Sequence, residues 1–432
     1  MKKLLCVGAA VALLAAGVTG CQKSEEETAA ASAGGTQTAQ TTITWWAFPT
    51  FGNEGLYERE VIAAFEAANP DIKVNLETID FTSGPDKIVA AIEGGTAPDV
   101  LFDAPGRIIE YGRNGKLVSL DDMFTDEFRT DVGNDALLSS CSDGQTYWMY
   151  PLSISPFCMS INREMWEEVG ALQYVNLEGD RAWTTENFIK ALDAFAAAGK
   201  IAISVYCGGQ GGDQGTRALV TNLYSGQMAN ADMTAYTMDS PENIRALQLI
   251  KEYADKGAID KGVSIVASDE LQRYQQGIFG SSICWGTSNA LNYATDAFTQ
   301  VTLPFPSDDG VPELEYLVNG FCVFDNQDAA RAEAAKKFVA FICDDAEWGP
   351  KSVIQSGAFP VRSSFGNLYP GNDEYALLSS WTQYYGPYYN TMKGFNGMRT
   401  EWWNMLQRIL LDTQPVEEAA AECASKATAG IN

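Results

Sequence analysis

Apolar positions recur near the start of the chain with two spacings, one typical of strands and one of helices. In IKVNLETI, residues 72–79, apolar and polar side chains alternate as they do in a half-buried strand. Within residues 58–68, Val61, Phe65 and Ala68 recur at the spacing of one helix face. The pattern predicts, in order, a strand over 43–46, a helix over 58–68, a strand over 72–79, a helix over 85–93 and a strand over 99–102. This order predicts parallel strands with helices packed on the sheet.

Later helices have recognisable ends. Thr184 and Thr185 can cap one helix, and Ser240 followed by Pro241 is typical of the start of another, which Gly257 closes. Three further amphipathic helices are predicted over 332–342, 402–411 and 415–426. The pattern indicates an α/β protein, and its length beyond residue 41 predicts two lobes, because one hydrophobic core rarely serves so long a chain.

Residues 1–41 lack this periodicity and are typical of a targeting segment with a tether. A basic start precedes an apolar run over 4–16 that is too short to span a bilayer. The motif VTGC, ending at Cys21, resembles a bacterial lipobox, which implies cleavage before Cys21 and diacylation of its thiol. An ordinary signal peptide with a chance cysteine is the alternative. Residues 22–41 are rich in Ala, Thr, Glu, Gly and Gln, so we expect a disordered tether that holds a domain at the extracytoplasmic face of the membrane.

Charge and residue types exclude several kinds of partner and chemistry. The formal net charge of −27 argues against nucleic acid as a partner. The absence of histidine removes Ser-His-Asp triads, Cys-His pairs and HExxH zinc sites. The loop GGQGGDQG, residues 208–215, fits a dinucleotide pattern only loosely, and we interpret it as a mobile loop or a ligand-facing turn. We therefore expect no enzyme activity, no cofactor and no metal.

The cysteines beyond the lipobox do not form a recognisable framework. Seven follow Cys21, an odd number, and their spacings exclude zinc knuckles. We expect most of them to pack as small hydrophobic residues; one or more disulfide bonds among them is the alternative.

Short segments from Ile43 to the C-terminus form a series in a fixed order. They are ITWWAF, FEAANPDIKV, IEGGTAPDVLF, LVSLDDMF, GQTYWMYPLSISPFCMSINREMWEEVG, AWTTENF, YQQGIFGSSICWG, LPFPSDDG, NGFCVF and SGAFPVRSS. In this order they resemble the extracellular solute-binding proteins of ABC importers, in the group similar to maltose-binding protein. Residues 161–164 (INRE) depart from the family's Y-N-K-D-like turn.

The resemblance implies a two-lobed, type II periplasmic-binding-protein-like fold with a ligand cleft between lobes joined by crossing strands. It places the chain crossings near Pro151 to Ser155, Leu303 to Pro306 and Phe359 to Arg362, where prolines would stiffen the connectors. The implied division is a signal peptide over 1–20, a lipidated tether over 21–41, lobe one over 42–152 and 304–358, and lobe two over 153–303 and 359–432.

Three residues at the ends of predicted strands are ligand-binding candidates, namely Trp46, Phe48 and Asp103. Trp46 and Phe48 lie at and just past the end of the first strand, where open α/β sheets bind ligands. Because alternate residues face opposite ways, we expect one of Trp45 and Trp46 in the core and the other at the cleft; the alternative is that both are core residues. Asp103 follows the strand DVLF and can accept hydroxyl protons or cap the next helix.

Later segments supply the remaining candidates. By the resemblance, Ser155 contacts ligand at the first crossing, and Tyr206 offers a ring and a hydroxyl from lobe two. Trp285 matches the family's Gly-Trp segment with the order reversed, so its orientation stays open. The last candidates are Asn319, Arg399, Trp402 and Trp403. Arg399 would either meet an anionic group of the ligand or lie at the surface.

The resemblance implies a lipid-anchored, monomeric receptor that binds a mono- or oligosaccharide by lobe closure and delivers it to the permease subunits of an ABC importer. One alternative is the same kind of receptor for glycerol-3-phosphate or another anionic small ligand. Alternatives of a different class are a surface glycoside hydrolase and a glycan-binding module without a transport role.

Overall fold

The computed structural model describes residues 40–52, 55–81, 83–209 and 213–431. The predicted signal peptide, Cys21 and nearly all of the tether lie outside the described residues, as do three residues of the loop 208–215. Within the described part of the chain, no helix is long and apolar enough to cross a membrane.

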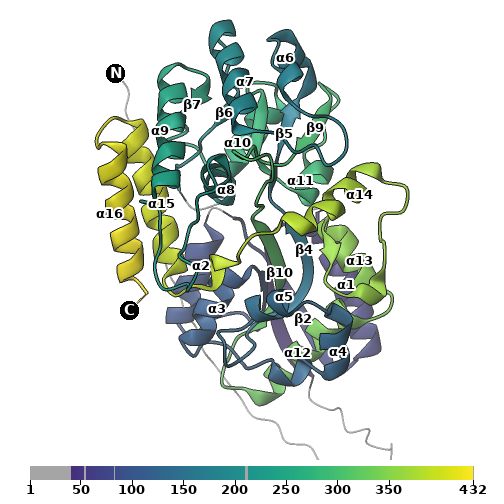
Figure 1. Ribbon diagram of the computed structural model, residues 1–432. Helices are drawn as coiled ribbons and strands as arrows, with labels where there is room; N and C mark the ends of the chain where they lie inside the picture. Colours follow the sequence, from purple (N-terminus) through teal and green to yellow (C-terminus); the bar gives the residue numbers. More distant parts are fainter. Residues whose placement is uncertain (1–39, 53–54, 82, 210–212, 432) are drawn as a thin grey trace, which may run out of the picture. The chain divides into compact units, whose positions relative to one another are not determined.

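Within these described ranges, the larger sheet has six strands in the order β11-β4-β10-β3-β1-β2. Its strands are β1 (Thr41–Ala47), β2 (Ile72–Thr78), β3 (Val100–Asp103), β4 (Tyr150–Pro156), β10 (Tyr316–Val323) and β11 (Phe359–Pro360). β1 pairs in parallel with β2 and β3, which confirms the parallel sheet that the hydrophobic pattern predicts. β10 is antiparallel to both β3 and β4, and lies beside β4 in Figure 1.

Helices cover this sheet because their apolar stripes face its hydrophobic side chains. The helices grouped with this sheet are α1 (Leu56–Ala68), α2 (Gly84–Glu93), α3 (Pro105–Arg113), α4 (Asp126–Val132), α5 (Asp135–Ser140), α12 (Ala329–Asp344) and α13 (Trp348–Ser356). α12 packs on β1, α13 on β4 and α3 on β10. α1 and α2 confirm the first two helices that the spacing predicts.

A second group of strands forms one sheet in the order β8-β5-β9 and a separate pair, β6-β7. These strands are β5 (Cys158–Asn162), β6 (Ile203–Ser204), β7 (Ile259–Asp260), β8 (Ser281–Trp285) and β9 (Gln300–Leu303). The helices around them are α6 (Arg163–Glu168), α7 (Thr185–Ala198), α8 (Gln214–Leu223), α9 (Pro241–Asp255), α10 (Ala267–Gln275), α11 (Thr287–Asn292), α14 (Asp373–Ser380), α15 (Phe395–Leu410) and α16 (Val416–Ala429). The 3-10 helices are η2 (Asp121–Met123), η3 (Leu172–Tyr174), η4 (Ser363–Phe365), η5 (Trp381–Tyr384) and η6 (Tyr389–Thr391).

Helix ends follow the predicted chemistry in two places. The hydroxyls of Thr184 and Ser240 accept hydrogen bonds from backbone N–H groups in the first turns of α7 and α9. The helix predicted to begin at Trp402 is longer, since α15 begins at Phe395. Tertiary packing accounts for the extra turns, because Met398 and Arg399 are buried there.

In the part of the chain that the structure describes, two separate hydrophobic clusters form the cores. The first contains residues from Ile43 to Ile154 and from Tyr316 to Val361. The second contains residues from Phe157 to Leu314 and from Leu378 to Ala427. We call these the first and second clusters. The lobe boundaries proposed from the sequence stay a prediction.

The connections between the clusters run side by side. Only Phe157 separates β4 from β5, and its N–H donates to the carbonyl of Glu315 at 2.8 Å. Glu315 ends the connection that returns from β9 to β10, so these two connectors are hydrogen-bonded to each other. Tyr385 and Phe359 pack against both clusters.

The seven described cysteines are all buried and free, which settles the disulfide question that the sequence leaves open for them.

Candidate functional site

Three side chains gather where the parallel strands of the larger sheet end. Phe48 follows β1, Phe81 lies three residues past β2, and Asp103 is the last residue of β3. The rings of Phe48 and Phe81 are stacked, with centroids 4.8 Å apart and an interplanar angle of 3°. The carboxyl edge of an open α/β sheet is where such folds bind ligands, so this edge is the first half of the candidate site.

Asp103 is paired with an arginine from the next helix. Arg107, in the first turn of α3, donates from Nε and Nη2 to the two carboxylate oxygens at 2.6 and 2.5 Å. The backbone N–H of Ala104 also donates to this carboxylate at 2.8 Å. The structure thus gives Asp103 an ion-pair partner that the sequence did not predict. The N-cap residue of α3 is Ala104, which has no side-chain cap bond, and a contact between Asp103 and a ligand hydroxyl stays a prediction. The Arg107 guanidinium lies 5.7 Å from the centre of the Phe48 ring.

The other half of the site comes from α8, α15 and the residue that precedes α8. The Asp213 carboxylate accepts bonds from Arg399 Nε at 2.9 Å and Nη2 at 2.5 Å, and also from Arg217 Nη1. These side chains are nearly inaccessible, with Arg217 0% and Asp213 4% exposed. Arg399 is thus neither a surface residue nor an unpaired cation.

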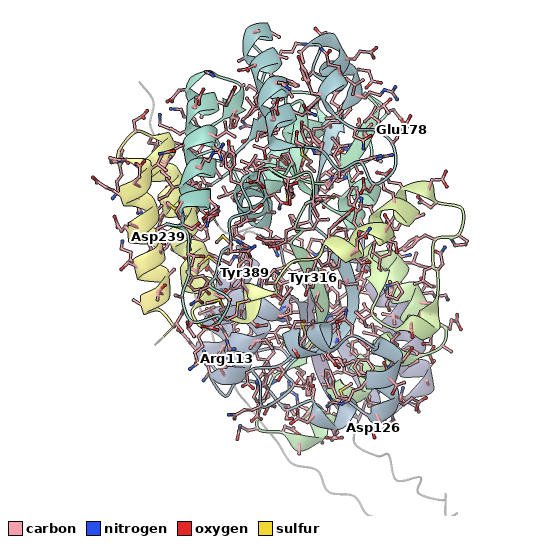
Figure 2. The ribbon with its side chains drawn as sticks, in the orientation of Figure 1. Arg113, Asp126, Glu178, Asp239, Tyr316 and Tyr389 are labelled. Carbon is pink, nitrogen blue, oxygen red and sulfur yellow. The ribbon has the colours of Figure 1, made fainter. Side chains whose placement is uncertain are left out.

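Arg217 extends this cluster to the connectors between the two hydrophobic clusters. Its Nε donates to the Tyr389 hydroxyl at 2.5 Å, and that hydroxyl donates to Glu315. Tyr389 belongs to η6 and Glu315 to the connection that enters β10. Figure 2 labels Tyr389 and also Tyr316, the first residue of β10 and a member of the first cluster; the ring of Tyr316 meets that of Tyr388, the residue before Tyr389, with centroids 4.9 Å apart. One fully buried cation therefore joins α8 to two connecting segments.

Burial and charge act against each other on these groups. Burial raises the pKa of Asp213, but the charges of Arg217 and Arg399 outweigh it and hold that pKa below its usual value. The charge of Arg107 lowers the pKa of Asp213 further, so the two halves of the site are electrostatically coupled. For Glu315, the effect of burial is larger than that of the Arg217 charge, so the pKa of Glu315 is raised.

A comparison of the sequence with protein families identifies the group to which it is related. The profile of the bacterial extracellular solute-binding proteins matches residues 60–376. The chain belongs to this family. Membership makes it a solute-binding protein that acts outside the cytoplasm, as the sequence resemblance implies.

Individual relatives are distant. A binding protein of Brucella abortus is 28% identical over 239 residues, which is 53% of this chain and 54% of that protein. The match thus spans about half the length of this relative.

Solved structures support the two-lobed α/β fold. The ABC substrate-binding protein Lmo0181 of Listeria monocytogenes, in complex with cycloalternan, superposes with a TM-score of 0.73 at 20% identity, covering 90% of this chain and 98% of that one. UgpB of Mycobacterium tuberculosis, in complex with glycerophosphocholine, gives 0.69 at 20% identity, covering 90% and 98%. At this identity, the likeness confirms the periplasmic-binding-protein fold and not the ligand.

In this solute-binding protein, the opening tryptophans lie on opposite faces of β1. Trp45 is 0% exposed and packs against Phe51, Phe321 and Phe338. Trp46 is 7% exposed, and the Lys87 ammonium lies 4.5 Å from the centre of its ring. Both belong to the first cluster, as in the alternative that both are core residues, and a ligand contact by Trp46 stays a prediction.

Tyr206 and Trp285 lie in the second cluster. Tyr206 is 3% exposed, and its hydroxyl donates to Cys284. Trp285 is 1% exposed, and its ring meets Tyr274 edge to face, while its indole Nε1 has no hydrogen-bond partner among the described residues. A buried indole N–H without a partner is costly, which makes Trp285 the stronger ligand candidate of the two.

The remaining predicted residues lie in β4, β10 and α15. Ser155 is buried in β4, and Asn319 is half-buried in β10 beside an irregularity in its pairing with β4. Trp402 is 1% exposed and donates to the Thr216 hydroxyl at 2.9 Å, so it anchors α15 on α8. Trp403 is half-buried against the second cluster.

Sequence reasoning missed Phe81, Arg107, Asp213 and Arg217. A usable signal exists for two pairs of site residues, because Asp103 with Arg107 and Asp213 with Arg217 have the i, i+4 spacing of ion pairs at helix starts. No local pattern marks Phe81, since its role depends on a ring that lies 33 positions earlier in the chain.

Proposed function

We propose that this protein is a lipid-anchored receptor of an ABC importer, which binds a carbohydrate between its lobes and delivers it to the permease. In this proposal Cys21 carries the lipid, the receptor works as a monomer and turns over no substrate, and the lobes divide as the sequence predicts. Family membership supports the receptor role, and the complexes of related folds with sugars support the ligand class.

The observation that carries the proposal is the balance of charge at the candidate site. Three guanidinium groups and three carboxyl groups come together there: Arg107, Arg217, Arg399, Asp103, Asp213 and Glu315. A sugar hydroxyl can donate to a carboxylate and accept from a guanidinium, so it fits such paired groups without bringing uncompensated charge.

The anionic-ligand alternative rests on Arg399, and the structure weakens it. Three hydrogen bonds tie this guanidinium to Asp213, at 2.5 to 3.1 Å. A phosphate would have to replace a carboxylate that stays ionised because its pKa is lowered. Because UgpB, which has a similar fold, is seen in complex with glycerophosphocholine, the test below includes anionic ligands.

The test is thermal unfolding of the mature chain with Cys21→Ser, which removes the lipid, against neutral mono- and oligosaccharides, glycerol-3-phosphate and sugar phosphates. A ligand at 100 times its Kd adds about 2.7 kcal/mol to the free energy of unfolding. We expect stabilisation by at least one neutral sugar and its loss in Asp213→Asn. Stabilisation by the anionic ligands alone would overturn the carbohydrate assignment. Release of reducing sugar from a glycan panel would overturn the assignment as a binding protein.

A further inference from the structure

Phe81 is an exposed aromatic ring, and among the described residues the one ring it stacks on is that of Phe48. It is 48% exposed, and it is the aromatic residue among the large hydrophobic side chains that are exposed in the described part of the chain. One face of the ring lies parallel on Phe48, which is 2% exposed. The ring therefore presents one flat apolar face outward.

The Phe48 ring that lies under Phe81 is closely packed. A Cβ on Gly84 would lie 2.9 Å from the Phe48 ring, so α2 packs against Phe48 with no room for a side chain. The Arg107 guanidinium is near the Phe48 ring, and Asp103 fixes that guanidinium through two hydrogen bonds. Because Phe81 is stacked on this closely packed ring, the Phe81 side chain should lose little conformational entropy when a ligand covers it.

The neighbourhood of Phe81 offers two kinds of contact. The ring is flat and apolar, and the Asp103–Arg107 pair at the same sheet edge supplies hydrogen-bond donors and acceptors. A sugar in its ring form has the matching surfaces, namely an apolar C–H face and a rim of hydroxyls. An open-chain alditol has the hydroxyls but no fixed C–H face.

We infer that the outer face of Phe81 is a stacking platform that makes this site selective for ring-form sugars over open-chain alditols. The inference rests on the proposed function and narrows its ligand class. Stacking on Phe81 should contribute about as much binding free energy as one aromatic contact, so Phe81→Ala should weaken the binding of a ring-form sugar about tenfold.

The experiment is calorimetric titration of the mature Cys21→Ser chain with matched probes: methyl α-D-glucoside and sorbitol, methyl β-D-xyloside and xylitol, and methyl β-D-riboside and ribitol. We expect the wild-type chain to bind at least one glycoside more tightly than its alditol. Phe81→Ala should remove this preference and leave the affinity for the alditol within about twofold. Phe81→Trp should retain the preference, and Phe81→Leu, which keeps apolar bulk without a ring, should lose it.

Two comparisons separate a binding effect from a folding effect. Leu411→Ala removes an apolar side chain of similar exposure, 53%, at the end of α15, and should leave all affinities unchanged. Unfolding temperatures of every variant without ligand report any loss of the Phe48 stack.

The outcomes distinguish the two proposals. If the wild-type chain binds none of these probes and none of the oligosaccharides of the unfolding test, the carbohydrate function itself is refuted and this inference with it. If only an oligosaccharide binds, the same Phe81→Ala comparison is made with that oligosaccharide and its reduced, alditol-ended form. If sugars bind but Phe81→Ala leaves their affinity within twofold, or weakens glycoside and alditol alike, the carbohydrate function stands and the platform is refuted.

Discussion

Glu270 is a buried carboxyl group whose replacement should stabilise the protein at neutral pH. It is 0% exposed, on α10, and accepts bonds from the Ser282 hydroxyl at 2.8 Å and the Ile283 N–H at 2.9 Å. The groups around it are Tyr206, Tyr274 and Cys284, whose pKa values are raised mainly by burial and further by the charge of Glu270. Among the described residues, no Lys or Arg forms an ion pair with Glu270.

The magnitude follows from its ionisation. Burial raises the pKa of Glu270 from 4.5 to about 8, and the two hydrogen bonds offset this only in part. Below pH 4.5 the carboxyl is protonated in both states and costs nothing. As the pH rises from 4.5 towards 8 the unfolded chain ionises while the fold keeps the proton, so stability falls by about 1.4 kcal/mol per pH unit. At pH 7 the accumulated loss is about 3 kcal/mol.

Glu270→Gln keeps the shape of the protonated acid and cannot ionise. We expect the variant to be about 3 kcal/mol more stable than the wild-type chain at pH 7, with the difference vanishing at pH 4. Urea unfolding of both chains at pH 4, 5, 6 and 7 measures this difference, and Glu333→Gln, at an exposed position of α12, serves as the matched control. A constant difference across this pH range, or a variant less stable at pH 7, would refute the reasoning.

Further substitutions test the ion cluster, a helix cap and the junction of β4 and β10. Asp213→Asn leaves the buried Arg399 without its counter-charge and Arg217 with Glu315 alone, and it should cost about 3–5 kcal/mol in urea unfolding. The exposed Glu333→Gln should cost far less, and similar stability of the two variants would contradict this. Ser240→Ala removes the N-cap of α9 and should cost about 1 kcal/mol, read as a lower unfolding temperature and refuted by an unchanged one. Gly320→Ala would place a Cβ 2.3 Å from the Tyr150 carbonyl oxygen, so it should cost about 1–3 kcal/mol in the same assay; wild-type stability would show that the strands can separate there freely.

Much of the local structure can be predicted from the sequence because neighbouring residues decide it. The period of two in residues 72–79 and the helical spacing in residues 58–68 correctly predict β2 and α1, since each pattern has one apolar face to bury. The caps at Thr184 and Ser240 are likewise local, because an N-cap oxygen accepts from N–H groups two or three residues later. The start of α15 could not be placed this way, because its first turns are held by packing against distant elements.

The candidate site is harder to predict because its contacts join remote segments. Asp103 is expected at the end of a strand and is the last residue of β3, yet the sequence says nothing of its partner or of the partner of Arg399. Arg399 meets Asp213 across 186 positions, and Arg217 meets Tyr389 across 172. The anionic-ligand alternative arose from this limit, because an arginine considered without its partner resembles an anion site.

The sequence by itself determined the α/β class, the order of the first five elements, the helix caps and the family, since these depend on the spacing and order of residues along the chain. Only the tertiary structure decided that Trp45 and Trp46 are both buried, that the described cysteines are free, that Arg399 is neutralised, and that Phe81 is stacked on Phe48. The physical reason is that burial and charge compensation depend on which groups meet in space. Those meetings join positions that no local pattern along the chain connects.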